Sequence, residues 1–213
     1  MSTSANDLRR TLEFLENHET RLRRLETQEI GVGLLGAGMT LIEELTPTGE
    51  TADFTSIPST YRHLQLRWIA QSDGGAAAPT LFLNFNGDTG FNYWHTNHIG
   101  LFSWGIDPSL HSVVSGGTGP DDLISLGQIP GTLNQDSESF GWGVADINYY
   151  TRVTYKTALV HSGCWRPEDM SNAQTYLSSG RWDSTAIIDQ ITVSMVTGQD
   201  FVTPSAFSLY GIL

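Results

Sequence analysis

The strongest constraint in this sequence is a change of composition close to residue 30. Residues 1–30 contain no Gly or Pro and hold five of the eleven basic side chains together with six acidic ones. The remaining residues contain every Gly and Pro of the chain and its only lysine, Lys156. Because Gly and Pro favour turns and their absence favours a continuous helix, we expect two different structural parts.

Residues 1–30 have the pattern of a helical coiled-coil stem. Leu8, Leu15 and Leu22 recur every seven residues, and Leu25 falls on the second apolar position of the same heptad. A single helix of this length is marginal in water, so a narrow apolar stripe on a charged helix implies partner helices. The seam is only half apolar, and we therefore expect the assembly to be held mainly by the part of the chain that follows.

Charged residues beside the stripe indicate the number of partners. Arg21 and Glu26 fall on flanking heptad positions whose spacing suits an ion pair between parallel chains. The segment 21–26 also resembles a coiled-coil trimerisation pattern, Arg-apolar-x-x-apolar-Glu. We expect a parallel homotrimer; a dimer, or a solvated helix lying on its own globular part, remains open. The expected trimerisation residues are Leu8, Leu15, Arg21, Leu22, Leu25 and Glu26.

The rest of the chain predicts a linker and one β domain. Glycines at positions 31, 33, 36 and 38 end the helix and make residues 31–39 a Gly-rich linker. Residues 40–213 alternate apolar and polar side chains in short runs separated by turn residues, which favours an antiparallel β-sandwich of the jelly-roll type. We expect strands over residues 39–45, 61–71, 80–85, 100–103, 110–115, 123–128, 148–162, 178–182, 187–197 and 206–212.

Composition excludes several classes of partner. The formal net charge of -12 argues against nucleic acid and against an anionic membrane surface. A single cysteine, Cys164, excludes an intrachain disulfide, and we expect a small buried thiol there rather than a nucleophile. The sequence has no apolar run long enough to cross a membrane and no signal-peptide pattern, so we expect neither membrane insertion nor export by that route.

Three segments of the β part carry a resemblance. They are Phe54 to Arg67, Leu83 to Tyr93 and Gly198 to Ile212. Together with the Gly-containing exit from a coiled coil, these segments resemble tailed-bacteriophage minor structural proteins of the fibre, spike and minor tail class. The resemblance implies a homotrimeric virion protein, made in the host bacterial cytoplasm, which contacts other virion proteins through its N-terminal helix. A head fibre or capsid decoration protein, a free lectin-like carbohydrate-binding module and a small glycan hydrolase are the alternatives.

No catalytic motif stands out, and we expect neither an enzyme nor a cofactor. Pairs of acidic residues such as Glu168-Asp169 are typical of solvated loops, although glycan hydrolysis does use two carboxylates. The segment 84–90 predicts a hairpin turn around Asn86-Gly87, because Asn-Gly tolerates positive φ. The oxygens of Asn84, Asn86 and Asp88, with Asn92, are a weaker candidate for a calcium site.

The segment 91–104 is the richest mixture of aromatic and polar groups in the chain. Sugars commonly stack on an aromatic ring while polar side chains bind their hydroxyls, so this segment is the candidate for contact with a host surface glycan. Its aromatic side chains are slightly more typical of a core or a trimer interface, and a metal shared by the two histidines is a weaker alternative. The candidate residues are Asn92, Tyr93, Trp94, His95, His98 and Trp104.

Overall fold

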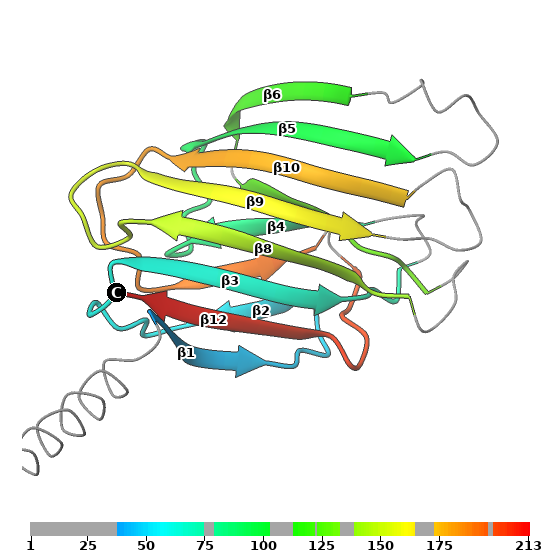
Figure 1. Cartoon of the computed structure of the whole chain (residues 1–213), viewed down its shortest axis with the longest axis horizontal. Coiled ribbons are helices and arrows are strands. Elements are labelled where there is room, and N and C mark those ends of the chain that lie inside the picture. The colour runs from blue at the N-terminus through cyan, green and yellow to red at the C-terminus, as the bar shows by residue number, and fades with distance from the viewer. Residues whose placement is uncertain are drawn as a thin grey trace, which may run out of the picture. The chain divides into compact units, whose positions relative to one another are not determined.

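The computed structural model of this chain is a β-sandwich of two antiparallel sheets (Figure 1). It describes residues 38–74, 79–102, 113–121, 123–132, 139–164, 173–195 and 198–213. The expected stem, with its six trimerisation residues, lies outside these ranges. Residues Leu41–Leu213 form one compact unit.

The two sheets are unequal. The large sheet has eight strands in the order β1-β12-β3-β8-β9-β10-β5-β6, and the small sheet has four in the order β2-β11-β4-β7. The strands of the large sheet are β1 (Met39–Leu45), β12 (Ala206–Ile212), β3 (His63–Ala70), β8 (Gly141–Asn148), β9 (Lys156–Cys164), β10 (Ala173–Trp182), β5 (Tyr93–Phe102) and β6 (Val113–Asp121). The strands of the small sheet are β2 (Thr51–Phe54), β11 (Ile191–Ser194), β4 (Thr80–Phe85) and β7 (Ile124–Gln128).

The chain crosses repeatedly between the sheets. Strands β1 to β4 alternate between the large and the small sheet. Strands β7, β8, β11 and β12 alternate in the same way if the remaining strands, β5, β6, β9 and β10, are left out. Those remaining strands, β5 with β6 and β9 with β10, are two antiparallel pairs that all lie beyond β8 in the large sheet. They widen this sheet on one side, as Figure 1 shows.

The alternating sequence pattern explains how the sheets pack. In β3, Leu64, Leu66 and Trp68 are buried and the residues between them are half-buried or exposed. The same alternation places Phe207 and Leu209 of β12 in the core. Successive side chains of a strand point to opposite faces, so each strand contributes one face to a common core between the sheets.

Two glycines allow the core to close. Gly143 in β8 lies opposite Trp68 in β3, and a Cβ built on Gly143 would lie 2.1 Å from Cζ2 of the Trp68 ring. A Cβ on Gly180 in β10 would lie 2.5 Å from the side chain of Ile124 in β7. Glycine at these positions leaves room for large side chains of the neighbouring strand and of the opposite sheet.

The predicted antiparallel β-sandwich is confirmed, and the strands over 39–45, 80–85 and 206–212 match the prediction at both ends. The expected single strand over 148–162 is wrong, because the chain turns at residues 149–155 and β8 ends where that strand was expected to begin. Strand β8 was missed because its glycines are typical of turns, whereas Gly143 makes room for Trp68. Strand β2 was missed as well.

Candidate functional site

A tight turn follows β4. Asn86 and Gly87 have φ of 54° and 63°, and the Asp88 N–H donates to the Phe85 carbonyl at 3.0 Å. Asn and Gly adopt this left-handed region at low cost, as the sequence predicted. The turn is not a hairpin, because β4 lies in the small sheet and β5 in the large one.

The side chain of Asn86 fastens this turn to the segment before β11. Its Nδ2 donates to the Ile187 carbonyl at 2.7 Å, and its Oδ1 accepts the N–H groups of Asp189 and Gln190 at 3.0 and 3.1 Å. These are backbone groups without a strand partner, which a buried or half-buried loop must satisfy. Asn86 therefore joins two loops that are distant in sequence.

Asp88 is the centre of a second set of hydrogen bonds. Its carboxylate accepts the indole N–H of Trp182 at 2.7 Å, the Gly90 N–H at 2.9 Å and the Asn92 side-chain amide at 3.0 Å. The Trp182 ring lies 5.6 Å from the Phe85 ring. Because Trp182 belongs to the large sheet and Phe85 to the small sheet, this cluster ties the two sheets together.

The oxygens proposed for calcium are partly used inside the protein. Both carboxylate oxygens of Asp88 and the side-chain oxygen of Asn86 accept protein N–H groups. Asn84 is buried and donates its Nδ2 to the Asp88 carbonyl at 2.5 Å. In the part of the chain that the structure describes, no three His, Cys, Asp or Glu side chains gather as a metal site. The contacts assign this loop a structural role, and the calcium site stays a prediction.

The hydrogen bonds of Asp88 predict acid sensitivity. Burial raises the pKa of this carboxyl, but the bonds from Trp182, Gly90 and Asn92 outweigh burial and leave the pKa below its ordinary value. A carboxyl with a lowered folded-state pKa stabilises the fold above its unfolded-state pKa, and this stabilisation is lost as the pH falls through the folded-state value. We expect Asp88→Asn to be destabilising at pH 7 and to differ less from the parent at pH 3. Urea unfolding of both proteins at the two pH values measures this, and an equal difference at both would contradict it.

The candidate glycan residues are divided by the two faces of β5. Tyr93 is fully buried, and its hydroxyl accepts the Phe85 N–H at 3.0 Å. His95 is half-buried on the same inner side, whereas Trp94 and His98 are exposed on the outer side. Asn92 is exposed but its amide binds Asp88. Trp104 lies outside the described residues. Of the six candidate residues, the structure therefore places only Trp94 and His98 together on one exposed strand face.

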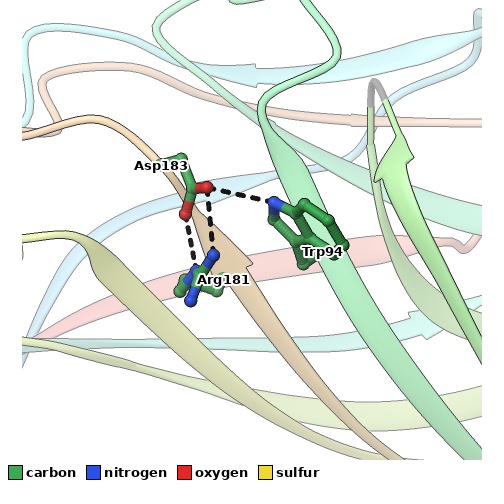
Figure 2. A network of polar contacts seen from close by, with 3 residues as sticks. All are labelled: Trp94, Arg181 and Asp183. Atoms are coloured by element: carbon green, nitrogen blue, oxygen red, sulfur yellow. Dashed lines mark hydrogen bonds and ion pairs between the residues drawn. The ribbon is translucent and has the colours of Figure 1, made fainter.

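Trp94 belongs to a polar cluster on this outer face (Figure 2). Its indole N–H donates to Asp183 at 3.0 Å, and the same carboxylate pairs with the Arg181 guanidinium at 2.5 Å. The Arg181 guanidinium also lies 5.8 Å from the Trp94 ring and 5.5 Å from the Tyr155 ring. Asp183 therefore holds Trp94 and Arg181 side by side at the surface.

A surface feature that sequence reasoning missed is an outer apolar face on the large sheet. It is defined here as Ile69, Trp142, Val144, Leu159 and Leu177, which come from β3, β8, β9 and β10. Four of these side chains are 47% (Ile69), 52% (Trp142), 49% (Leu159) and 48% (Leu177) exposed. Exposed apolar residues are ordinary when scattered, but a contiguous group is typical of a binding surface.

Strand register brings these side chains to one side of the sheet, with polar residues among them, since Leu159 lies opposite Asp146 and Ser179. Ile69 lies opposite Trp142, and His161 lies opposite both Val144 and Leu177. The rings of Trp142 and His161 are 5.5 Å apart, edge to face. Residues opposite each other in antiparallel strands point to the same side of the sheet. Each strand shows the alternation of apolar and polar residues in its sequence, but only the pairing register shows that these residues share one face.

Known proteins resemble this chain only weakly. No protein-family model and no curated protein sequence matches it. Among solved structures, the SPRY domain of human HERC1 aligns over 75% of this chain and 99% of its own length, at 9% identity and a TM-score of 0.14. Infectious bursal disease virus Gx strain aligns over 83% of this chain and 40% of its own, at 9% identity and a TM-score of 0.15. Scores this low do not establish a shared fold. Among the described residues, no helix is long and apolar enough to span a membrane.

Proposed function

We propose that this chain is a structural component of a bacteriophage virion, a homotrimer of the tail fibre or minor tail type. Its head is a jelly-roll sandwich, and its N-terminal helix contacts other virion proteins. It is made in the host bacterial cytoplasm and incorporated into the particle. The observation that carries this proposal is the outer apolar face, and the strand order and the sequence pattern support it.

Strand order supports the jelly-roll assignment. Without the two inserted strand pairs, the large sheet reads β1-β12-β3-β8 and the small sheet reads β2-β11-β4-β7. Strands consecutive in the chain, such as β1 and β2 or β11 and β12, then hold the same place in the two sheets. This arrangement follows from folding a long hairpin over itself, as in two Greek keys. Jelly rolls occur in viral capsid proteins and in lectins, so the order favours a class of proteins and not one function.

The outer apolar face favours association with other copies of the chain. Half-exposed Ile69, Trp142, Leu159 and Leu177 lie on adjacent strands, and the face they form extends over the width that β9 and β10 add to the large sheet. Association removes such a surface from water at a gain of about 25 cal/mol per Å². In the proposed trimer, three sheets turn these faces toward one axis. The seam of the stem is only half apolar, which is consistent with a head that supplies most of the trimer interface.

A free lectin-like module is the second candidate. Exposed Trp94 beside Arg181 and Asp183 offers an aromatic ring with neighbouring polar groups, a combination that sugar sites use. Such a module would bind a sugar as a monomer. A head fibre or capsid decoration protein would associate in the same way as a tail fibre, and detection of the chain in tail or head preparations of purified particles separates these two locations.

Charged residues on the face test the proposal. We expect Leu159→Asp combined with Leu177→Asp to weaken the trimer more than tenfold, because the two carboxylates lose their hydration in the interface. The measurement is sedimentation equilibrium of the full chain over a range of concentrations. Ile187→Asp is the matched control, since Ile187 is 47% exposed and lies outside this face. An unchanged mass distribution for the double variant would contradict the proposed interface.

A further inference from the structure

A cavity of about 350 Å³ opens where two loops meet at one end of the large sheet. One loop, residues 60–62, leads into β3, and the other, residues 149–152, follows β8. These strands pair, with Leu64 opposite Ile147, so the loops lie beside each other. The residue after β12 also reaches the cavity, and the lining residues are Thr60, Tyr61, Arg62, Tyr149, Thr151, Arg152 and Leu213.

The cavity gathers positive charge in an acidic protein. The chain has a formal net charge of -12, yet two of the four arginines that the structure describes line this one cavity. Both Arg62 and Arg152 are exposed side chains, and within the described ranges neither forms an ion pair with a carboxylate. Arg181, by contrast, is paired with Asp183 at 2.5 Å. Because neither guanidinium is paired with a carboxylate, both have fork-shaped donors that can bind an external anion.

Arg152 is held in place by a strained residue. Tyr149 has φ of 49°, which is unusual for a bulky side chain and persists only where the surroundings enforce it. The Tyr149 N–H donates to Nδ1 of His63 at 3.3 Å, and its ring lies 4.5 Å from the His63 ring. The Arg152 guanidinium lies 3.9 Å from the centre of the Tyr149 ring, and the Arg152 N–H donates to the Tyr149 carbonyl at 3.0 Å.

A buried cation stabilises the same loop from beneath. Lys156, the only lysine of the chain, is fully buried, and its Nζ donates to the carbonyls of Arg152 and Thr154 at 2.8 and 2.7 Å. Burying an ammonium group is costly unless its donors are satisfied, so these bonds hold the loop backbone firmly. On the other side, Tyr61 packs over Gly211, where a Cβ would lie 2.3 Å from its ring. These contacts fix the loop 149–154 and the Tyr61 ring, which form part of the cavity wall.

We propose that this cavity binds a sugar residue that carries a carboxylate or a phosphate group. Arg62 and Arg152 bind the anionic group, because guanidinium forks match the oxygens of both groups. The side chains of Thr60 and Thr151 supply hydroxyls that bond the sugar hydroxyls, and a cavity of this size lies at the lower end of those that hold small ligands. The site does not depend on a place in a virion, since a free protein would have the same cavity.

Calorimetric titration of the full chain at low ionic strength tests this site. The probes are a trisaccharide of galacturonic acid, glucose 1-phosphate, neutral glucose and inorganic phosphate. We expect one or both of the charged sugars to bind, and the better of the two identifies the anionic group. Binding should weaken as salt is added, because the contact is charged and lies at the surface.

Variants locate the binding. Arg62→Gln and Arg152→Gln should each weaken binding of the charged sugar at least tenfold, and Arg152→Lys should weaken it less, because it keeps the charge and loses the fork. Arg67→Gln is the matched control, since Arg67 is an exposed arginine on the sheet face, and we expect a change of less than about twofold. Absence of binding by either charged sugar, equal binding of neutral glucose, phosphate binding as tight as that of the sugars, or full affinity in the Gln variants would each overturn the proposal. Circular dichroism of each variant establishes that it is folded.

Discussion

Replacing Trp182 with Ala should lower the free energy of unfolding by about 3–5 kcal/mol, the usual cost of truncating a large buried aromatic residue. Trp182 is 2% exposed, its ring stacks at 6.2 Å on the Tyr93 ring, and its indole N–H binds Asp88 at 2.7 Å. The substitution leaves a cavity between the sheets and removes one donor from a half-buried carboxylate. Urea unfolding followed by circular dichroism measures the change.

Phe91 provides the matched control for this prediction. It is an aromatic residue in the adjoining loop and is 72% exposed, so Phe91→Ala should change the free energy of unfolding by no more than about 0.5 kcal/mol. Equal effects for Phe91→Ala and Trp182→Ala would contradict the description of Trp182 as the residue that ties the sheets together.

The second large effect is expected at Gly143. A Cβ there would lie 2.1 Å from the Trp68 ring, which is closer than two carbon atoms can approach. Gly143→Ala should therefore lower the free energy of unfolding by about 2–3 kcal/mol, through displacement of the ring or of the strand. Urea unfolding followed by circular dichroism measures this change in the free energy of unfolding.

A double substitution makes this prediction specific. Trp68→Leu should be destabilising by itself, but Gly143→Ala should cost much less in that background because the clash is gone. Gly49→Ala is the control, since a Cβ at Gly49 would meet nothing within 4 Å. Additive effects of Trp68→Leu and Gly143→Ala would show that the two residues do not compete for the same space.

Strands with a clear alternation were predictable from the sequence. In β12, Phe207 and Leu209 alternate with residues that face outward, and the predicted and observed ends coincide. The turn at Asn86-Gly87 was equally predictable, because few other residue pairs take positive φ in succession. In both cases the information is local, so neighbouring residues alone determine the conformation.

The strands that were missed depend on contacts distant in sequence. Gly141 and Gly143 indicate a turn when β8 is read alone, and only the ring of Trp68 on the next strand explains why glycine belongs inside a sheet. The sequence also did not predict that β8 ends at Asn148 and that a loop precedes β9. Aromatic and branched residues typical of strands continue through Tyr149, Tyr150 and Val153, although Tyr149 has positive φ.

The candidate site was predictable only in part, because residue type does not determine which face of a strand is outward. Tyr93 and Trp94 are equally plausible sugar-stacking residues in the sequence, yet the first is fully buried and the second is 42% exposed. The cavity between Arg62 and Arg152 has no local sequence signal at all, since the pairing of β3 with β8 brings its two loops together. Sites assembled from register are therefore the ones that sequence reasoning misses.

Solution mass tests the central proposal, trimerisation through the outer apolar face, most directly. The measurement is light scattering of the full chain and of a chain that starts at Gly31, which retains the compact unit Leu41–Leu213. We predict a mass near three times 23.4 kDa for the full chain and continued association of the shortened chain, because the face containing Trp142 and Leu177 is present in both. A monomer for both chains would contradict the proposed trimer and would favour a free binding module.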